Sequence, residues 1–328
     1  MTIPIFFTFD RYYVLAAGVA FHSLLKHASP RYHYMLYVVH TSLSAHHCTL
    51  LRRIVEQFPY ASIIFKDASG YDTGWEQLQN KSHFSKEIFY KLTAAGMFPE
   101  YDRILFSDVD VIFTADISPS FFLFPNEKFY YAGARPILVN ESLPAYRKDF
   151  TPEEIKIINQ YEFSAGYMLI NLKCIREDDM QPKLIRFFHQ NLHRLRLPEQ
   201  DCIALCCYPY LRFLDYKYVV CNYMYAKRPE ILEFNTNNPL LSDRNKALSL
   251  FQEMLDEVVQ LHYPGAEKPW NNPRVLKFKV WQQACRDAAL YGYYLRLQPL
   301  FVWQRLKRYN VKRFLRKVWR NITGSHLQ

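Results

Sequence analysis

The chain has 328 residues, of which 50% are hydrophobic and 17% aromatic, with only 9 glycines. This composition suits a globular α/β protein with a large core, in one or two domains, and excludes a disordered or collagen-like chain. No apolar run reaches the roughly 18 residues of a membrane-spanning helix. The sequence enters a strand-like run without the charged start of a signal peptide, so we expect a cytoplasmic protein. Its seven cysteines form no Cys-x-x-Cys pair, which favours reduced thiols.

The formal net charge of +10 is concentrated at the C-terminal end. After residue 287 there is no Asp or Glu, and the Lys and Arg residues alternate with Trp, Phe and Leu at helical spacing. This pattern predicts an amphipathic helix on an anionic membrane surface. A helix packed on the body and a nucleic-acid contact are the alternatives, the second least favoured. We expect a catalytic domain at 1–275, a basic aromatic membrane-attachment region at 276–328, and no nucleic-acid partner.

Strands and helices alternate in the first third of the chain. Strands are predicted at Ile3–Phe9, Tyr34–Val39, Ala61–Phe65 and Ile104–Phe106, and helices at Ala16–Leu25, at Leu43–Gln57 and after a capping Ser85. This order indicates a mostly parallel, doubly wound sheet covered on both faces. No Gly-x-Gly-x-x-Gly is present, which disfavours a dinucleotide-binding protein.

The middle of the chain is less regular. A polar, broken stretch at Pro136–Asn159 predicts a mobile loop over a site. The other predicted elements are strands at Phe129–Ala134, Ser164–Asn171, Arg212–Phe213 and Tyr218–Tyr223, and helices at Pro182–Leu195 and Pro198–Leu205.

The most informative segment is RILFSDVDVIF at residues 103–113. A buried strand is followed by Asp108 and Asp110, whose side chains point the same way on an extended backbone. They would project at the carboxyl end of a strand, where open α/β sheets bind ligands. Two carboxylates this close repel each other unless a cation lies between them, so the pattern predicts a divalent metal that bridges a diphosphate. Two solvated acids at a strand end are the alternative.

Several motifs occur together in a recognisable order. They are FTFD at 7–10, SDVD at 107–110, FSAGYMLINL at 163–172, PEQD at 198–201 and HYPGAEKPW at 262–270. The set resembles glycosyltransferase family 8, and within it the bacterial lipopolysaccharide galactosyl- and glucosyltransferases, from about Ile3 to about Trp270. The resemblance implies a GT-A fold, a UDP-sugar donor, Mn²⁺ with Mg²⁺ as a second candidate, and transfer with retention of configuration. It also implies a peripheral enzyme at the inner face of the bacterial inner membrane, with a lipid-linked core oligosaccharide as acceptor.

The resemblance assigns the metal and diphosphate contacts residue by residue. Asp108, Asp110 and His262 are the implied metal ligands, and carboxylates with an imidazole suit Mn²⁺ better than Mg²⁺. Gly265 would let the backbone approach the diphosphate. Lys268 would place a positive charge beside the β-phosphate as UDP leaves.

The uridine would lie at the end of the first strand. Thr8, Asp10 and Tyr13 resemble the family's nucleoside contacts, with Asp10 as a hydrogen-bond acceptor and Tyr13 stacked on the base. Asp10 as a helix cap is the alternative. Val109, between the two aspartates, is assigned to the donor site with them. Trp270 would either serve the site or anchor its loop.

The donor sugar would meet four further residues. Lys91 stands where relatives usually have Arg, and it would contact the donor sugar or diphosphate. Ser164 replaces an Asn that faces the sugar, and Glu199 replaces an Asp that binds a sugar hydroxyl. Gln200 would lie at the β-face of the anomeric carbon, and Asp201 would orient its neighbours or cap their helix. These departures leave the choice between galactose and glucose open.

The implied reaction is displacement of UDP by an acceptor hydroxyl. A double displacement needs a carboxylate below the anomeric carbon. Because the Gln200 amide is neutral, we favour attack from the face that UDP leaves, with a covalent intermediate on Glu199 as the minority hypothesis. The rival classes are a phosphatase of the haloacid dehalogenase type, a non-catalytic sugar- or membrane-binding protein on a transferase scaffold, and a glycogenin-like transferase with a protein acceptor.

Overall fold

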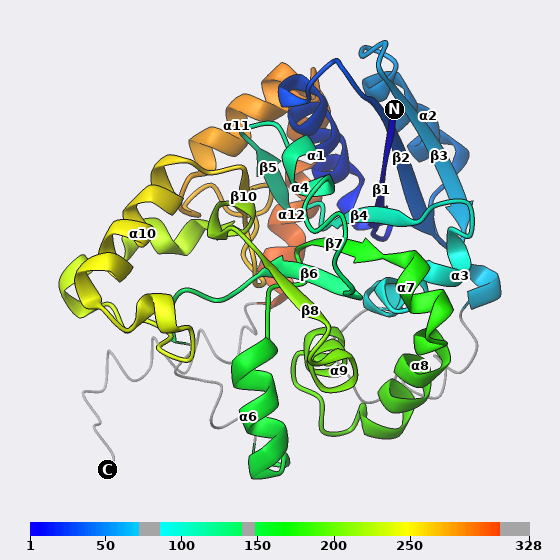
Figure 1. Ribbon diagram of the computed structural model, residues 1–328. Coiled ribbons are helices and arrows are strands. Elements are labelled where there is room, and N and C mark those ends of the chain that lie inside the picture. The colour runs from blue at the N-terminus through cyan, green and yellow to red at the C-terminus, as the bar shows by residue number, and fades with distance from the viewer. Residues whose placement is uncertain (72–85, 140–147, 309–328) are drawn as a thin grey trace.

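The computed structural model describes residues 1–71, 86–139 and 148–308, built around a seven-stranded sheet with the order β3-β2-β1-β4-β7-β6-β8 (Figure 1). Its strands are β1 (Thr2–Thr8), β2 (His33–His40), β3 (Ala61–Asp67), β4 (Arg103–Ser107), β6 (Tyr131–Ala134), β7 (Tyr167–Asn171) and β8 (Leu211–Leu214). Most neighbours are parallel, but β7 is antiparallel to both β4 and β6. The predicted α/β class and mostly parallel sheet are confirmed, and the mixed character introduced by β7 was not predicted.

The first strand shows why this sheet is covered on both sides. After Thr2, every residue of β1 is buried. Ile5 and Phe7 belong to one hydrophobic core and Phe6 to another, because successive side chains of a strand point to opposite faces. Helix α1 (Val14–His27) packs in the first core and is buried along most of its length. Helix α2 (Ala45–Val55) contacts α1 and β3.

A second, smaller sheet adjoins the first. It has the order β5-β10-β9, formed by β5 (Val111–Phe113), β10 (Gln260–His262) and β9 (Val220–Cys221). Strand β5 follows β4 after only three residues, so the chain passes directly from the large sheet into the small one. The remaining α-helices are α3 (Ala94–Met97), α4 (Ser118–Phe121), α6 (Pro152–Tyr161), α7 (Leu172–Glu177), α8 (Met180–Asn191), α9 (Pro198–Cys207), α10 (Arg244–Asp256), α11 (Phe278–Asp287) and α12 (Tyr291–Arg308).

Two predicted elements are wrong. The loop predicted at Pro136–Asn159 contains helix α6 from Pro152 onward, because Thr151 and Glu154 form a capping box and Pro152 suits the first helical position. Residues 140–147 of that stretch lie outside the described residues. The strand predicted at Tyr218–Tyr223 is only the two-residue β9, flanked by the 3-10 helices η4 (Tyr216–Tyr218) and η5 (Asn222–Ala226).

The predicted helix before β4 is also different. Its residues form the 3-10 helix η3 (Lys86–Lys91) and the single turn α3, and the proposed cap Ser85 lies outside the described residues. Thr93, the residue before α3, makes no side-chain cap hydrogen bond. The short elements η3 and α3 therefore stand where one longer helix was predicted.

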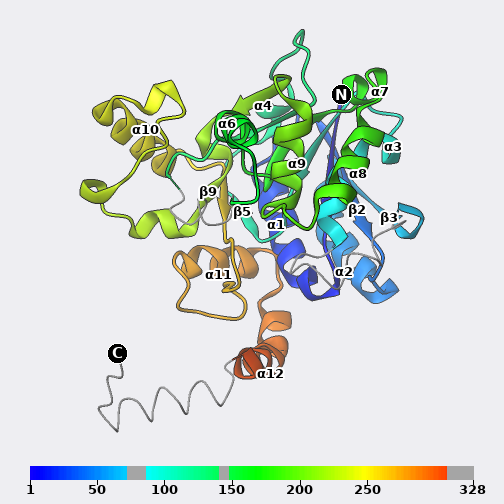
Figure 2. The same ribbon diagram turned by 90° about the horizontal axis from the view of Figure 1, so that it is seen from below.

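The C-terminal helices pack on the body on one side only. Trp281, Tyr294 and Phe301 are buried in the same core as α1. Leu300 and Trp303 are 43% and 53% exposed, on a helix at the edge of the molecule beyond α11 (Figure 2). One side of α12 therefore packs on the body, as the alternative to membrane binding predicted. The tail beyond residue 308 lies outside the described residues. Within the described chain, no helix is long and apolar enough to cross a membrane.

Helix α6 is tied to the body by one bidentate ion pair. The guanidinium of Arg194 donates to both carboxylate oxygens of Glu154, at 2.7 and 2.6 Å. These bonds hold the pKa of Glu154 below its ordinary value of 4.5. The pair therefore stabilises the fold above about pH 4.5, and this contribution is lost as the pH falls through the lowered pKa.

We predict that Glu154→Gln lowers the free energy of unfolding by about 1–2 kcal/mol at pH 7. The amide still caps α6 but loses the ion pair. The difference from wild type should shrink below about pH 4.5, measured by urea unfolding across pH. Glu153→Gln, on the same turn and exposed, is the matched control. Equal stability of both variants at pH 7 would show that the ion pair contributes nothing.

Candidate active site

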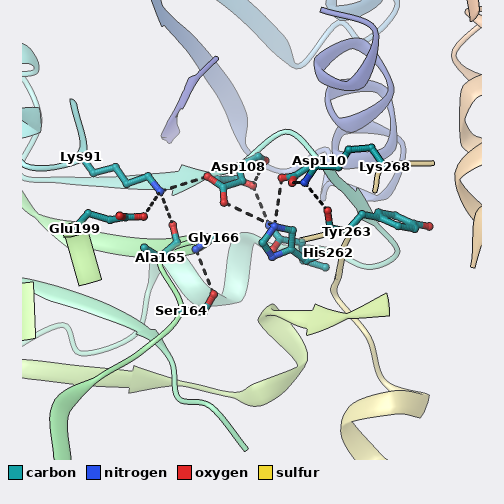
Figure 3. A network of polar contacts seen from close by, with 12 residues as sticks. Lys91, Asp108, Asp110, Ser164, Ala165, Gly166, Glu199, His262, Tyr263 and Lys268 are labelled. Carbon is teal, nitrogen blue, oxygen red and sulfur yellow. Dashed lines mark hydrogen bonds and ion pairs between the residues drawn. The ribbon is translucent and has the colours of Figure 1, made fainter. Parts of the chain in front are cut away.

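The two aspartates lie in the turn between the two sheets. Ser107 ends β4 and Val111 begins β5, so Asp108 and Asp110 stand where the chain changes sheets. His262 ends β10 and is the register partner of Val111. The backbone amide of the next residue, Tyr263, donates to the Asp110 carbonyl at 2.9 Å. Strand pairing therefore brings His262 to the aspartates from about 150 positions away (Figure 3).

The three side chains converge closely enough to share one cation. Their donor atoms, from Asp108, Asp110 and His262, lie within 4.8 Å of one another. His262 Nε2 is 3.3 Å from Asp110 Oδ1 and 3.8 Å from Asp108 Oδ2. Two carboxylates and an imidazole form a donor set that fits a divalent metal ion and is well suited to Mn²⁺.

Each aspartate also has a lysine of its own. Lys91 Nζ lies 3.4 Å from Asp108 Oδ1 and 3.3 Å from Glu199 Oε1, and it donates to the Ala165 carbonyl at 3.2 Å. Lys268 forms an ion pair with Asp110 and donates to the Tyr263 carbonyl at 2.7 Å. Both lysines are buried, 3% and 6% exposed. The two lysines, which we had assigned to the donor, therefore offset the charges of Asp108 and Asp110 (Figure 3).

Burial and charge act in opposite directions on these groups. Burial raises the pKa of Asp108 above its usual range, although Lys91 counteracts it. Burial would do the same to Asp110, but His262 and Lys268 hold its pKa well below the ordinary value. Burial lowers the pKa of His262, yet the Asp110 carboxylate outweighs this and raises it to about 10. The site is therefore a dense cluster of opposite charges, largely buried except at Asp108, whose side chain is 30% exposed.

Gly166 packs against two of the candidate metal ligands, Asp108 and His262. Its carbonyl accepts from the Asp108 amide at 3.0 Å, and its own amide donates to Ser164 Oγ at 3.4 Å. A Cβ atom there would lie 3.0 Å from His262 Cε1 and 3.3 Å from Asp108 Oδ2. Close packing explains the glycine, which we had not assigned to the site although it stands in the FSAGYM motif.

A buried polar pair joins the two sheets behind the site. Gln260 Nε2 donates to Ser107 Oγ at 2.9 Å, and Ser107 Oγ donates to the Asp108 carbonyl at 2.7 Å. Gln260 and Ser107 are both fully buried. This contact fixes the strand that carries His262 against the strand that leads to Asp108. We had not assigned either residue, because a side-chain contact between β4 of one sheet and β10 of the other cannot be inferred before the topology is known.

The predicted uridine residues lie at the end of β1. Thr8 ends this strand, and its buried hydroxyl has no hydrogen-bond partner among the residues that the structure describes. Asp10 accepts from the Tyr12 amide at 2.8 Å, which confirms the cap alternative, and burial raises its pKa. The Tyr13 ring contacts Trp270 edge-on, with centroids 5.5 Å apart. Trp270 is 5% exposed and packs on the core, so it anchors its loop.

The remaining predicted residues are Val109, between the two aspartates, and Glu199, Gln200 and Asp201 on α9. Val109 is buried, 4% exposed. Glu199 and Gln200 stand in the first turn of α9, where Asp201 accepts from the amides of Arg196 and Leu197 at 2.9 and 3.0 Å.

Gly265 lies in the loop that leads from His262 to Lys268. Gly265 has a φ of 81° and is exposed, and a Cβ there would meet nothing within 4 Å. Its backbone conformation, rather than lack of space, is what favours glycine.

The mixed, mostly parallel α/β sheet with its smaller companion sheet has a GT-A-like architecture. The profile described as Glycosyl transferase family 8 matches residues 4–273, and the chain belongs to this family. It is a family of retaining sugar transferases, which take a nucleotide-sugar donor and a sugar acceptor and typically use a divalent metal. Membership excludes the phosphatase alternative.

Solved structures support the fold. The bifunctional glycosyltransferase WbbM gives a TM-score of 0.71 at 19% identity over 90% of this chain, which spans only 52% of the WbbM chain. The galactosyltransferase LgtC with donor and acceptor sugar analogues gives 0.62 at 18% identity, over 89% of this chain and 96% of that chain. GlyE of Streptococcus pneumoniae TIGR4 gives 0.59 at 18% identity, over 90% of this chain and 64% of that chain. No curated protein sequence matches the chain.

We predict that Gly166→Ala weakens Mn²⁺ binding at least about 10-fold, as expected when a residue that supports metal ligands is changed. The added methyl group would push His262 and Asp108 apart. Binding is measured by electron paramagnetic resonance of free Mn²⁺, and thermal unfolding checks the fold. Gly292→Ala, where a Cβ meets nothing within 4 Å, is the control. Unchanged Mn²⁺ affinity in Gly166→Ala would contradict this role.

Proposed function

We propose that the protein transfers a hexose, galactose or glucose, from UDP to a lipid-linked lipopolysaccharide or lipooligosaccharide core, with retention of configuration. The convergence of Asp108, Asp110 and His262 beside Lys268 is the observation that carries this proposal. Mn²⁺ is the expected metal and Mg²⁺ the second candidate. When bound, the ion would neutralise charge on the diphosphate of the donor.

The protein's own groups would hold the donor from three sides. Thr8, Asp10 and Tyr13 would bind the uridine, and the unpartnered Thr8 hydroxyl supports this assignment. The loop at Gly265 would lie against the diphosphate. Lys268, which is paired with Asp110, would also stabilise the negative charge that develops on the β-phosphate oxygen as UDP leaves.

The sugar would lie over the Lys91–Glu199 pair. Ser164 and Glu199 would bind its hydroxyls, and Gln200 would face the anomeric carbon. Glu199 is 7% exposed and its carboxylate is paired with Lys91, which disfavours its use as a nucleophile. This supports attack by the acceptor hydroxyl from the face that UDP leaves, with a departing phosphate oxygen taking the proton.

We predict that the protein with Mn²⁺ slowly hydrolyses one UDP-hexose and that Asp110→Asn lowers this rate about 100-fold or more. The amide keeps the shape but removes a ligand charge. UDP release is measured across a panel of UDP-sugars, with and without a chelator.

The matched control is Asp102→Asn, an exposed acid at the other end of β4. No turnover of any donor, together with no Mn²⁺-dependent binding of UDP, would overturn the proposed function. It would favour a non-catalytic sugar-binding protein on the same scaffold.

The acceptor would lie at a membrane. Besides Leu300 and Trp303, the exposed apolar side chains of α12 are Leu295 and Val302, each 51% exposed, and the residues that follow are strongly basic. Exposed apolar groups next to basic ones favour an anionic membrane surface. This supports a lipid-linked acceptor at the inner face of a bacterial inner membrane over a glycogenin-like protein acceptor.

We predict that the full chain binds vesicles containing anionic phosphatidylglycerol and that the double variant Leu300→Ser, Trp303→Ser weakens binding about 10-fold or more. The reason is the loss of apolar burial at the interface. Sedimentation with vesicles measures binding, and neutral phosphatidylcholine vesicles give the charge control. Equal binding by the variant would mean that this surface of α12 does not meet lipid.

A further inference from the structure

Cys221 stands beside the imidazole of His262 in the small sheet. Strand β10 lies between β5 and β9, and Cys221 of β9 is the register partner of His262 on β10. Register partners on neighbouring strands point to the same face of a sheet, and the strands lie about 4.8 Å apart. The half-buried thiol of Cys221 is therefore on the face that carries the candidate metal ligand.

The thiol and the imidazole also interact. Burial lowers the pKa of His262 and the Asp110 carboxylate raises it, and Cys221 is the next side chain that raises it. The same thiol interacts with Tyr223, whose pKa is raised by burial first and by Cys221 second. The sulfur atom of Cys221 therefore has polar neighbours, unlike a cysteine packed in an apolar core.

One ring nitrogen of His262 lacks a partner. Nε2 faces carboxylate oxygens, at 3.3 Å from Asp110 Oδ1 and 3.8 Å from Asp108 Oδ2 (Figure 3). Nδ1 is buried, and among the described residues it makes no hydrogen bond. A metal-binding histidine almost always donates from its second ring nitrogen to a neighbouring group, which fixes the tautomer and the orientation of the ring. His262 Nδ1 therefore needs an acceptor once Nε2 binds a metal.

Gly166 does not supply this acceptor. A Cβ atom on Gly166 would lie 3.1 Å from His262 Nδ1, so that nitrogen faces a residue without a side chain. The Gly166 carbonyl already accepts from the Asp108 amide at 3.0 Å. Cys221 is left as a polar neighbour of the ring, and a cysteine sulfur is a weak hydrogen-bond acceptor.

The sulfur of Cys221 is not itself placed as a metal ligand. Within the described residues, the donor atoms that lie within 4.8 Å of one another come from Asp108, Asp110 and His262, without the thiol. A thiolate ligand would also favour softer ions than Mn²⁺. Any effect of Cys221 on the metal must therefore pass through His262.

We infer that Cys221 is a positioning residue for the metal site, whose sulfur accepts from His262 Nδ1–H and so directs Nε2 toward the metal. The inference rests on the proposed function, because it takes His262 as a metal ligand. The contact fixes one tautomer of the imidazole and opposes rotation of the ring away from the aspartates. The affinity for Mn²⁺ thus depends on a side chain outside the ligand set.

The first test is Mn²⁺ binding by the full chain with UDP, measured by electron paramagnetic resonance of free Mn²⁺. Cys221→Ala should weaken binding about 10-fold or more, as expected when a group that orients a metal ligand is removed. Cys221→Ser should retain most of the affinity, because its hydroxyl can also accept. Cys48→Ala removes a half-buried thiol from α2 and should leave binding unchanged.

The second test observes the tautomer itself. The full chain with isotope-labelled histidine rings is loaded with Zn²⁺, a diamagnetic ion that binds such a donor set more tightly than Mn²⁺. In proton–nitrogen correlation spectra His262 should carry its proton on Nδ1 alone, and His262→Gln identifies the signal by its loss. Cys221→Ala should add a second form with the proton on Nε2, a change that a general loss of stability does not produce.

The outcomes separate the inference from the function on which it rests. Absence of Mn²⁺ binding by the wild type refutes the metal site and with it the proposed function. Wild-type binding together with an unchanged affinity in Cys221→Ala refutes the role of Cys221 alone. An equal loss in Cys221→Ala and Cys221→Ser, or a single Nδ1–H form in Cys221→Ala, refutes it as well, because the cysteine would then act only through its shape.

Discussion

Two carboxylates held side by side at the junction of the two sheets are the constraint that the rest of this structure serves. Asp108 and Asp110 are two residues apart, and their repulsion in a low-dielectric site would be prohibitive if uncompensated. Positive groups reach them from widely separated segments: Lys91 from η3, His262 from β10 and Lys268 from the loop that follows. Together with a protonated His262, the two lysines offset the charges of Asp108, Asp110 and the neighbouring Glu199.

The candidate metal ligands of this charged cluster are brought together by two different sheets. The large sheet delivers Asp108 at the carboxyl end of β4, and the small sheet delivers His262 by pairing β10 with β5. A single-residue slip between β5 and β10 would turn the imidazole away, since side chains alternate along a strand. Two hydrogen bonds oppose such a slip. One is the buried side-chain bond from Gln260 to Ser107, and the other runs from the backbone amide of Tyr263 to the carbonyl of Asp110. Burying polar groups between the sheets thus serves the geometry of the metal ligands.

The local signals in the sequence predicted half of this arrangement. The strand before Asp108 and the like-facing aspartates follow from periodicity, whereas His262 and Lys268 were assigned through the family resemblance that the HYPGAEKPW motif carries. Sequence periodicity did not reveal Gly166, Ser107 or Gln260, since their roles depend on contacts between segments distant in the chain. The helix at Pro152–Tyr161 was missed for a different reason, because its polar composition concealed the capping box at Thr151 and Glu154.

Lys91 and Glu199 illustrate a change that only the structure explains. Taken separately, a lysine where relatives have arginine and a glutamate where they have aspartate each put the donor contacts in doubt. The structure places the Lys91 ammonium 3.3 Å from the Glu199 carboxylate, so the two residues form an ion pair and their expected donor contacts are not independent. Because the same ammonium lies 3.4 Å from Asp108 Oδ1, the pair is also linked to the candidate metal ligands. A substitution of Lys91 or Glu199 would therefore alter both the ion pair and the surroundings of Asp108, so neither residue can be interpreted independently of the other.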